Sequence, residues 1–287
     1  MSERDERERI AKKHIGLMKN VYGAEIAACI KSAKIFEDGD GRELDIGEAR
    51  FEATETCVTG DFAAKVVYRN SGKCVVVDAG SFTRPGGTYE TGGGGPESML
   101  CADSALYPVL AALKETYYDK NRGWESGQLM SDRALYLTDV PFSRGGERRD
   151  ADVVVIAAPN RTRALENGRS PELCDQYLGF RIEAMLRVAA QGGADVLVCP
   201  AFGCGRDGND TAVVIGHIQS WLEAHPGVFE KVVFSVPRSS EAAFVEAFGR
   251  EVRETRPVAV VATSDDDDEE DDEDWRDIEL PEGITLG

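Results

Sequence analysis

The stretch Cys74-Val75-Val76-Val77-Asp78-Ala79-Gly80, together with the loop of residues 81–98 that follows it, decides the fold. A short, unbroken run of β-branched residues predicts a strand that is buried on both faces of a sheet. The loop after it contains six glycines. Because glycine has no side chain, backbone N–H groups in such a loop can approach a phosphate or a ribose closely, although plain flexible loops share this composition.

Other apolar runs repeat the pattern of the first strand. They cover residues 153–157, 196–199 and 231–236, with a weaker run at residues 135–137. Helical patterns lie between them, at residues 98–118, 180–191, 211–225 and 240–255. Strands that alternate with helices predict an α/β domain with a mostly parallel or mixed sheet covered on both faces. In such sheets a ligand binds outside the carboxyl ends of the strands, where the glycine-rich loop lies.

The length of 287 residues favours one core with appendages. We expect an N-terminal helical extension at residues 1–50, a ligand-binding domain at residues 51–255 and an acidic, disordered tail at residues 256–287. The tail carries a net charge of -11 of the chain's -19, and it includes ten consecutive acids. These acids repel one another and cannot bury apolar area, so the tail is either simply solvated or a docking site for a basic partner.

Several classes of function are disfavoured by composition. The folded part is moderately acidic, which argues against nucleic-acid binding through a basic face. The sequence lacks an apolar run long enough for a membrane helix and lacks a signal-peptide core, so we expect no membrane contact and an intracellular, soluble protein. The seven cysteines are scattered without a Cys-x-x-Cys pair, which predicts neither disulfides nor a zinc site. We expect no cofactor and no metal.

A second loop, Ala201-Phe202-Gly203-Cys204-Gly205-Arg206-Asp207-Gly208-Asn209-Asp210, follows the run at residues 196–199. It precedes a helix that we expect to be capped by Asp210 or Thr211, so its amides can also converge on a phosphate. Two such loops at one edge of a sheet are what a diphosphate between two sugars requires. The pair is therefore a stronger signal than either loop alone.

At the level of motifs the chain resembles the microbial-type poly(ADP-ribose) glycohydrolase family of the macrodomain superfamily. The resemblance rests on Thr83-Arg84-Pro85-Gly86-Gly87, on Phe202-Gly203-Cys204-Gly205 and on matches at residues 9–11, 51–56, 100–101, 104–107, 138–142, 158–160, 208–210 and 232–234. It implies a macrodomain-like three-layer α/β/α sandwich that binds ADP-ribose or ADP-ribosylated protein. It also implies a hydrolase that acts on ADP-ribosylation.

The sequence departs from the family where the resemblance places the catalytic acid. The family's Gln-Glu-Glu is Pro96-Glu97-Ser98 here, so a hydroxyl at Ser98 replaces the acid. Asp78 and Arg84 stand where the family has asparagines, and Thr88 replaces a glycine. Substitutions that cluster in the site while the scaffold markers remain indicate altered chemistry, or binding without chemistry.

Asp78 and Glu97 are the carboxylates that we expect at the distal ribose. Two carboxylates can activate a water and stabilise positive charge at the anomeric carbon, which suits even an arginine-linked ADP-ribose. The alternatives are a turn residue for Asp78 and a first-turn helix glutamate for Glu97. We expect Asp103 to point to solvent and Glu90 to be a solvated loop acid.

The ligand-binding residues that we expect belong to the two loops. Tyr89 and Phe202 can stack on adenine or cover a ribose, with core packing as the alternative for Phe202. Arg206 either neutralises the diphosphate or is solvated. The full set is Gly86, Gly87, Thr88, Tyr89, Phe202, Gly203, Cys204, Gly205 and Arg206. Two functions stay open: an ADP-ribosyl glycohydrolase with altered catalytic residues, or a catalytically inactive reader of ADP-ribose.

Overall fold

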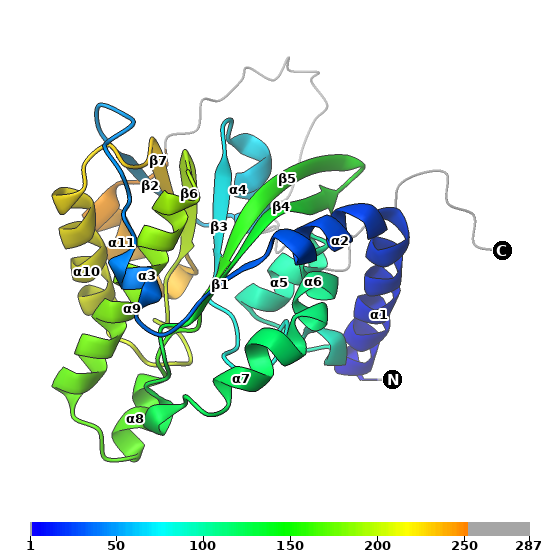
Figure 1. Ribbon diagram of the computed structural model, residues 1–287, viewed down its shortest axis with the longest axis horizontal. Helices are drawn as coiled ribbons and strands as arrows, with labels where there is room; N and C mark the ends of the chain where they lie inside the picture. The colour runs from blue at the N-terminus through cyan, green and yellow to red at the C-terminus, as the bar shows by residue number, and fades with distance from the viewer. Residues whose placement is uncertain (1, 252–287) are drawn as a thin grey trace, which may run out of the picture.

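The computed structural model describes residues 2–251. The predicted acidic tail, residues 256–287, lies outside that range, as does the end of the helix predicted at residues 240–255. The described residues form a seven-stranded sheet in the order β1-β4-β5-β3-β6-β7-β2. Helices cover both faces of this sheet, with α9, α10 and α11 on one side and α1, α2, α5 and α6 on the other (Figure 1). The predicted three-layer α/β/α sandwich is confirmed.

The strands confirm the apolar runs and add two that the sequence pattern missed. Their bounds are β1 (Lys34–Phe36), β2 (Glu55–Thr59), β3 (Cys74–Asp78), β4 (Ala134–Arg144), β5 (Glu147–Val155), β6 (Val196–Pro200) and β7 (Lys231–Ser235). The five predicted runs correspond to β3 to β7. The missed strands are β1 and β2, which lie at the two edges of the sheet, and their short mixed sequences carry no buried-strand signal.

Strand directions confirm a mixed, mostly parallel sheet. β3 runs parallel to both β5 and β6, β6 runs parallel to β7, and β7 runs parallel to β2. Among the described strands the antiparallel pairs are the hairpin of β4 with β5 and the pairing of β4 with the edge strand β1. The carboxyl ends of β3, β5 and β6 therefore meet at one edge, as parallel strands require.

Of the four helical patterns between the strands, all but one correspond to a helix, α9, α10 or α11, although α9 begins nine residues before its pattern; α4, α7 and α8 were not predicted. The bounds of the helices are α1 (Glu3–Val21), α2 (Gly23–Ser32), α3 (Asp40–Glu43), α4 (Ala63–Arg69), α5 (Pro96–Ala102), α6 (Leu106–Ala112), α7 (Asp119–Asn121), α8 (Arg161–Glu166), α9 (Pro171–Gln191), α10 (Thr211–Ala224) and α11 (Arg238–Phe248). Tighter or wider turns are η1 (Tyr89–Thr91), η2 (Lys114–Tyr118) and η3 (Ser126–Gln128).

The exception is the pattern at residues 98–118, which is not one helix but α5, α6 and η2 in succession. Between α5 and α6 the chain forms backbone hydrogen bonds with β4. The Ala105 N–H donates to the carbonyl of Pro141 at 2.8 Å, and the Ser143 N–H donates to the carbonyl of Asp103 at 3.0 Å. A tertiary contact therefore breaks a helix that its local sequence permits.

The N-terminal helices pack on the same core as the sheet. Met18 of α1 and Ile26 of α2 share a hydrophobic cluster with Val76 of β3, and β1 joins the sheet itself. The boundary predicted at residue 51 stays a prediction. Within residues 2–251, no helix has the length and apolar character needed to cross a bilayer.

Candidate functional site

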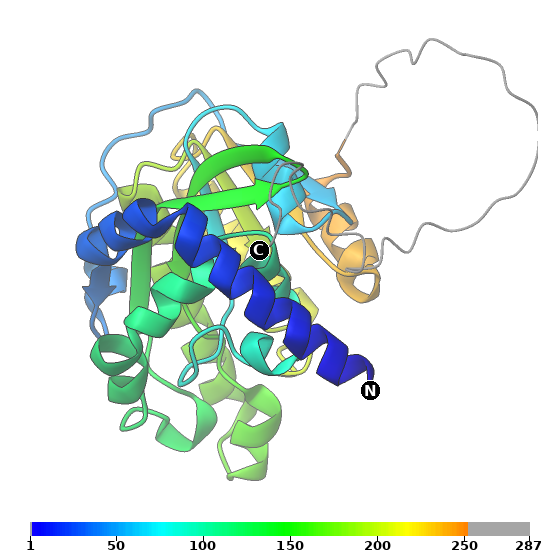
Figure 2. The ribbon, with the colours of Figure 1, turned by 90° about the vertical axis from the view of Figure 1, so that its right-hand side faces the viewer.

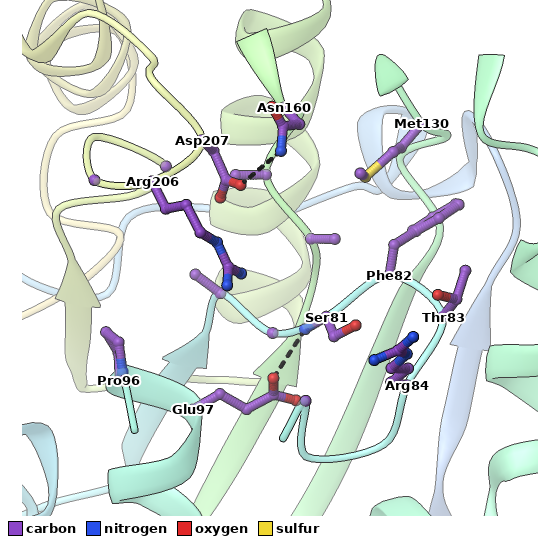
Figure 3. Close-up of a pocket in the computed structure, with 18 of the residues that line it drawn as sticks. Ser81, Phe82, Thr83, Arg84, Pro96, Glu97, Met130, Asn160, Arg206 and Asp207 are labelled. Carbon is purple, nitrogen blue, oxygen red and sulfur yellow. Dashed lines mark hydrogen bonds between the residues drawn. The ribbon is translucent and has the colours of Figure 1, made fainter. Parts of the chain in front are cut away.

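A cleft of about 1140 Å³ opens at the carboxyl ends of β3, β5 and β6. Four stretches supply most of its wall: the loop after β3, the first turn of α5, the segment from β5 into α8, and the loop after β6 (Figure 3). This is the edge at which the strand pattern places a ligand. The two glycine-rich loops are thus brought to one cleft.

The first loop approaches the cleft through glycines that no other residue can replace. Gly87 has a φ of +58°, and a Cβ built there would lie 2.6 Å from Glu97 Oε2. Gly86 has a φ of +61°, and its Cβ would lie 2.5 Å from the Tyr107 ring. Left-handed backbone and contacts this short both require glycine. The tight turn brings the backbone against the carboxyl group of Glu97.

Asp78 and Glu97 face each other across Gly80 at the end of β3. A Cβ at Gly80 would lie 2.8 Å from Glu97 Oε1 and 3.2 Å from Asp78 Oδ2. Glu97 Oε2 accepts a hydrogen bond of 3.0 Å from the Ser81 N–H (Figure 3). Both Oδ atoms of Asp78 and Oε1 of Glu97 are buried and lack a hydrogen-bond partner among residues 2–251. The turn-residue alternative for Asp78 is therefore not what the structure shows.

The two carboxyl groups are shifted toward their neutral forms. Burial raises the pKa of Asp78 to about 7. Burial, and then the nearby charge of Asp78, raise the pKa of Glu97 well above its usual value, against smaller opposing effects of backbone N–H groups and Arg206. Two carboxyl groups this close in a buried site cannot both ionise easily. Near neutral pH, the pair holds a proton.

The second loop presents an arginine to the cleft from the opposite side. Gly203 has a φ of +70°, and its Cβ would lie 2.8 Å from the Cβ of Ala158. Arg206 points into the cleft, and Arg84 of the first loop lies across from it (Figure 3). Neither arginine has an ion pair within residues 2–251. As predicted, Asp210 caps α10, since its Oδ1 accepts from the Ala212 N–H at 2.8 Å.

The structure brings together only part of the expected site. Of the predicted site residues, those that line the cleft are Gly87, Thr88, Glu97, Ser98, Gly203, Gly205 and Arg206. Five others do not line it: Asp78, Gly86, Tyr89, Phe202 and Cys204. Asp78 lies directly behind the wall, in contact range of Gly80. Gly86 packs against Tyr107, also behind the wall.

The two aromatic predictions need correction. Phe202 is 0% exposed and packs in the core between the sheet and α10, so it follows the core-packing alternative. Tyr89 is 6% exposed, and its hydroxyl lies 2.8 Å from Nδ1 of His14 on α1. Both rings are thus used inside the protein and cannot stack on a ligand in this conformation. The sequence around Tyr89 and Phe202 does not indicate whether their rings point into the core or into the cleft.

The prediction for Asp103 is wrong. Its side chain is 13% exposed, and its Oδ2 lies 3.4 Å from Arg144 Nη1. The helical pattern gives the wrong face because α5 ends at Ala102. Glu90 is exposed, as expected, and accepts a hydrogen bond from the Tyr107 hydroxyl.

Sequence reasoning missed the wall between β5 and the loop at residues 125–130. Asn160 caps α8, accepting from the Arg163 N–H, and its Nδ2 donates to Asp207 at 3.3 Å (Figure 3). Met130 and Phe82 form an apolar patch further along (Figure 3). Met130 has a φ of 62°, which no local pattern reveals. Asn160, which directly follows a predicted strand, carried a signal that could have found it.

No three His, Cys, Asp or Glu side chains gather into a metal site within residues 2–251. The cysteines of this range are all free thiols.

Comparisons with known proteins agree with this arrangement. Residues 12–145 match the family model described as microbial-type PARG, catalytic domain. No curated protein sequence matches the chain significantly. A solved structure of poly(ADP-ribose) glycohydrolase from Thermomonospora curvata matches with a TM-score of 0.75 and 24% identity, over 85% of this chain and 100% of that one.

Two further solved structures contain ligands. The Thermomonospora curvata enzyme bound to the inhibitor ADP-HPD matches with a TM-score of 0.74 and 25% identity, over 85% of this chain and 100% of that one. The Deinococcus radiodurans enzyme in complex with ADP-ribose matches with a TM-score of 0.69 and 27% identity, over 77% of this chain and 96% of that one. Residues 12–145 thus resemble the catalytic domain of the microbial-type poly(ADP-ribose) glycohydrolase family, and the described chain shares the macrodomain-like fold of these solved glycohydrolases.

Proposed function

We propose that the cleft binds an ADP-ribose unit and that the Asp78–Glu97 pair hydrolyses the glycosidic bond at its distal ribose. The observation that carries this proposal is the position of the pair. Two buried carboxyl groups with three unpartnered oxygens meet where both glycine-rich loops converge. Unsatisfied buried polar groups are rare in folded proteins, and a catalytic role is one explanation for them.

The diphosphate fits between the two loops. The backbone N–H groups of Gly205 and Arg206 donate to no acceptor within residues 2–251, and both residues line the cleft. The guanidinium groups of Arg206 and Arg84 lie on opposite sides of the cleft (Figure 3). Free amides and two arginines supply the donors and the positive charge that a diphosphate needs. The matched enzyme from Deinococcus radiodurans is a complex with ADP-ribose, which supports this ligand.

The reaction needs one proton, and the pair can provide it. As the bond from the anomeric carbon breaks, the neutral carboxyl donates its proton to the leaving atom. The charged one stabilises the oxocarbenium-like transition state. Water then adds to the anomeric carbon and returns a proton to the pair, so free ADP-ribose and the protonated leaving group are the products. Ser98, at the position of the family's acid, has no acidic proton to give at neutral pH.

The unpartnered oxygens also favour an arginine-linked substrate. A guanidinium leaving group carries N–H donors and positive charge; Glu97 in the cleft wall has an unpartnered acceptor oxygen, and the carboxyl group of Asp78 lies directly behind it. Planar pairing of guanidinium with carboxylate is a strong, directional interaction. We therefore propose ADP-ribosyl arginine as a substrate beside poly(ADP-ribose).

The test is the release of ADP-ribose from poly(ADP-ribose), from arginine-linked and from carboxylate-linked substrates, measured beside ligand binding by calorimetry. We expect Glu97→Ala to lower release at least about 100-fold, the typical size of acid–base assistance. Glu115→Gln is the control, because Glu115 is an exposed acid outside both the cleft wall and the glycine-rich loops. Undiminished release by Glu97→Ala would remove Glu97 from the mechanism.

A reader of ADP-ribose is the second candidate. It is favoured by Ser98 at the position of the family's acid and by the hydrogen bond that already occupies Glu97 Oε2. The same experiment separates the two functions. Heat of ADP-ribose binding without release from any of the three substrates would establish the reader.

A further inference from the structure

The first helix holds the tip of the glycine-rich loop through two arginines. Arg4 Nε donates to the carbonyl of Thr91 at 3.1 Å, and Arg7 Nε donates to the carbonyl of Gly92 at 2.9 Å. In both ribbon views the N-terminal half of α1 lies beside the segment that leads into α5 (Figures 1 and 2). These residues are more than 80 positions apart in the sequence.

Backbone packing joins α1 to the same point. Gly92 has a φ of +71°, and a Cβ built there would lie 2.3 Å from the carbonyl oxygen of Arg4 and 2.7 Å from the backbone nitrogen of Glu8. The loop therefore touches the helix with bare backbone. Any side chain at Gly92 would push the two apart, because neither backbone can move aside cheaply.

A buried tyrosine makes the third contact. The Tyr89 hydroxyl lies 2.8 Å from His14 Nδ1, and its ring packs edge-on against Tyr107 at 5.5 Å between centroids. Burial lowers the pKa of His14 to about 4, so the imidazole is neutral at ordinary pH. A neutral imidazole and a phenol pair well without solvent.

The turn η1, which α1 contacts, connects directly to the cleft on both sides. Gly87 and Thr88 line the cleft before η1, and Gly94 and Gly95 line it after η1. The turn is closed by the Gly93 N–H, which donates to the carbonyl of Thr88 at 2.8 Å. A shift of this turn away from α1 must therefore also move the loop segments on either side of it, residues 87–88 and 94–95, which form part of the cleft wall.

We propose that α1 is a clamp that fixes the ligand-binding loop, with Arg4, Arg7 and His14 as positioning residues. Tyr89 then acts through His14, not by touching the ligand. A glycine-rich loop is flexible on its own, and a loop that is fixed before binding loses less entropy when the ligand arrives. The clamp thereby raises the affinity of the cleft. This part of the inference rests on the proposed ADP-ribose function.

The experiment compares Arg4→Ala/Arg7→Ala and His14→Ala with Arg9→Ala in the whole chain. Arg9 lies on the same helix and pairs only with Glu6 in the described structure. Hydrogen exchange of residues 88–95 in the free protein reports the clamp, and calorimetry with ADP-ribose reports the site. His14→Asn can keep a hydrogen bond to Tyr89 and is the conservative variant.

We expect faster exchange in the loop and about tenfold weaker ADP-ribose binding for both clamp variants, no change for Arg9→Ala, and at least partial recovery in His14→Asn. Unchanged exchange in the clamp variants would overturn the clamp. Faster exchange with unchanged affinity would overturn its link to the site. If the wild-type chain bound no ADP-ribose, the proposed function would fail, and the exchange comparison would still decide whether α1 fixes the loop.

Discussion

Replacing Asp78 by Asn should make the protein more stable above neutral pH while lowering its activity. Asp78 is fully buried, its oxygens have no partner in the described chain, and burial raises its pKa from 3.8 to about 7. Between these two values the folded state binds more protons than the unfolded state. Stability therefore falls as the pH rises through this window, and the cost is complete above about pH 7.

The magnitude follows from the same pKa. A difference of about 3 in pKa corresponds to about 4 kcal/mol, and this is an upper limit because Glu97 shares the proton. Asn has no charge to bury, and its Nδ2 can donate to the unpartnered Oε1 of Glu97. We therefore expect Asp78→Asn to gain up to about 4 kcal/mol at about pH 8 and to gain almost nothing at about pH 4.

Urea unfolding followed by circular dichroism, at about pH 4, 6 and 8, measures this difference. Glu115→Gln removes one exposed charge elsewhere on the protein and is the control. Parallel pH profiles for wild type and Asp78→Asn would refute the reasoning, since they would mean that Asp78 does not change its protonation on folding. Release of ADP-ribose should fall in the same variant, because the pair then lacks one carboxylate.

Three other variants test the cleft. Ser98→Glu restores an acid at a position that lines the cleft. Release of ADP-ribose from poly(ADP-ribose) should then rise by about 100-fold or more. An unchanged rate would mean that the new acid cannot reach the glycosidic bond. Gly205→Asp should abolish ADP-ribose binding in calorimetry without unfolding the chain, since no atom lies within 4 Å of a Cβ there; unchanged affinity would refute the phosphate placement. Arg206→Ala should weaken binding by about tenfold, and the loss should shrink at high salt if the contact is electrostatic.

The unpaired carboxyl groups illustrate a trade of stability for function. A buried apolar residue at position 78 would avoid the desolvation cost that raises the pKa of Asp78. This desolvation cost arises at the end of β3, where both glycine-rich loops meet. Sites that bind or react with charged groups often retain such destabilising residues.

Local sequence patterns determined the layers of this protein and the ends of the strands that carry the site. Buried strands such as β3 and β6 need continuous apolar runs because both of their faces are covered, and that requirement is visible in the residues themselves. The glycines of both loops can also be identified from the sequence, because Gly87 and Gly203 have a backbone conformation that other residues rarely adopt. Asp78 and Glu97 could be named from their places beside these features.

Only the tertiary structure decided the direction of each side chain near the cleft. Tyr89 and Phe202 turn inward because His14 of α1 and the core beside α10 offer them partners, and those partners are distant in the sequence. Asp103 is mostly covered and pairs with Arg144 because α5 ends early, where the chain bonds with β4. Local spacing specifies which residues lie on a strand or in a loop, whereas contacts between distant segments determine which of them reach the ligand.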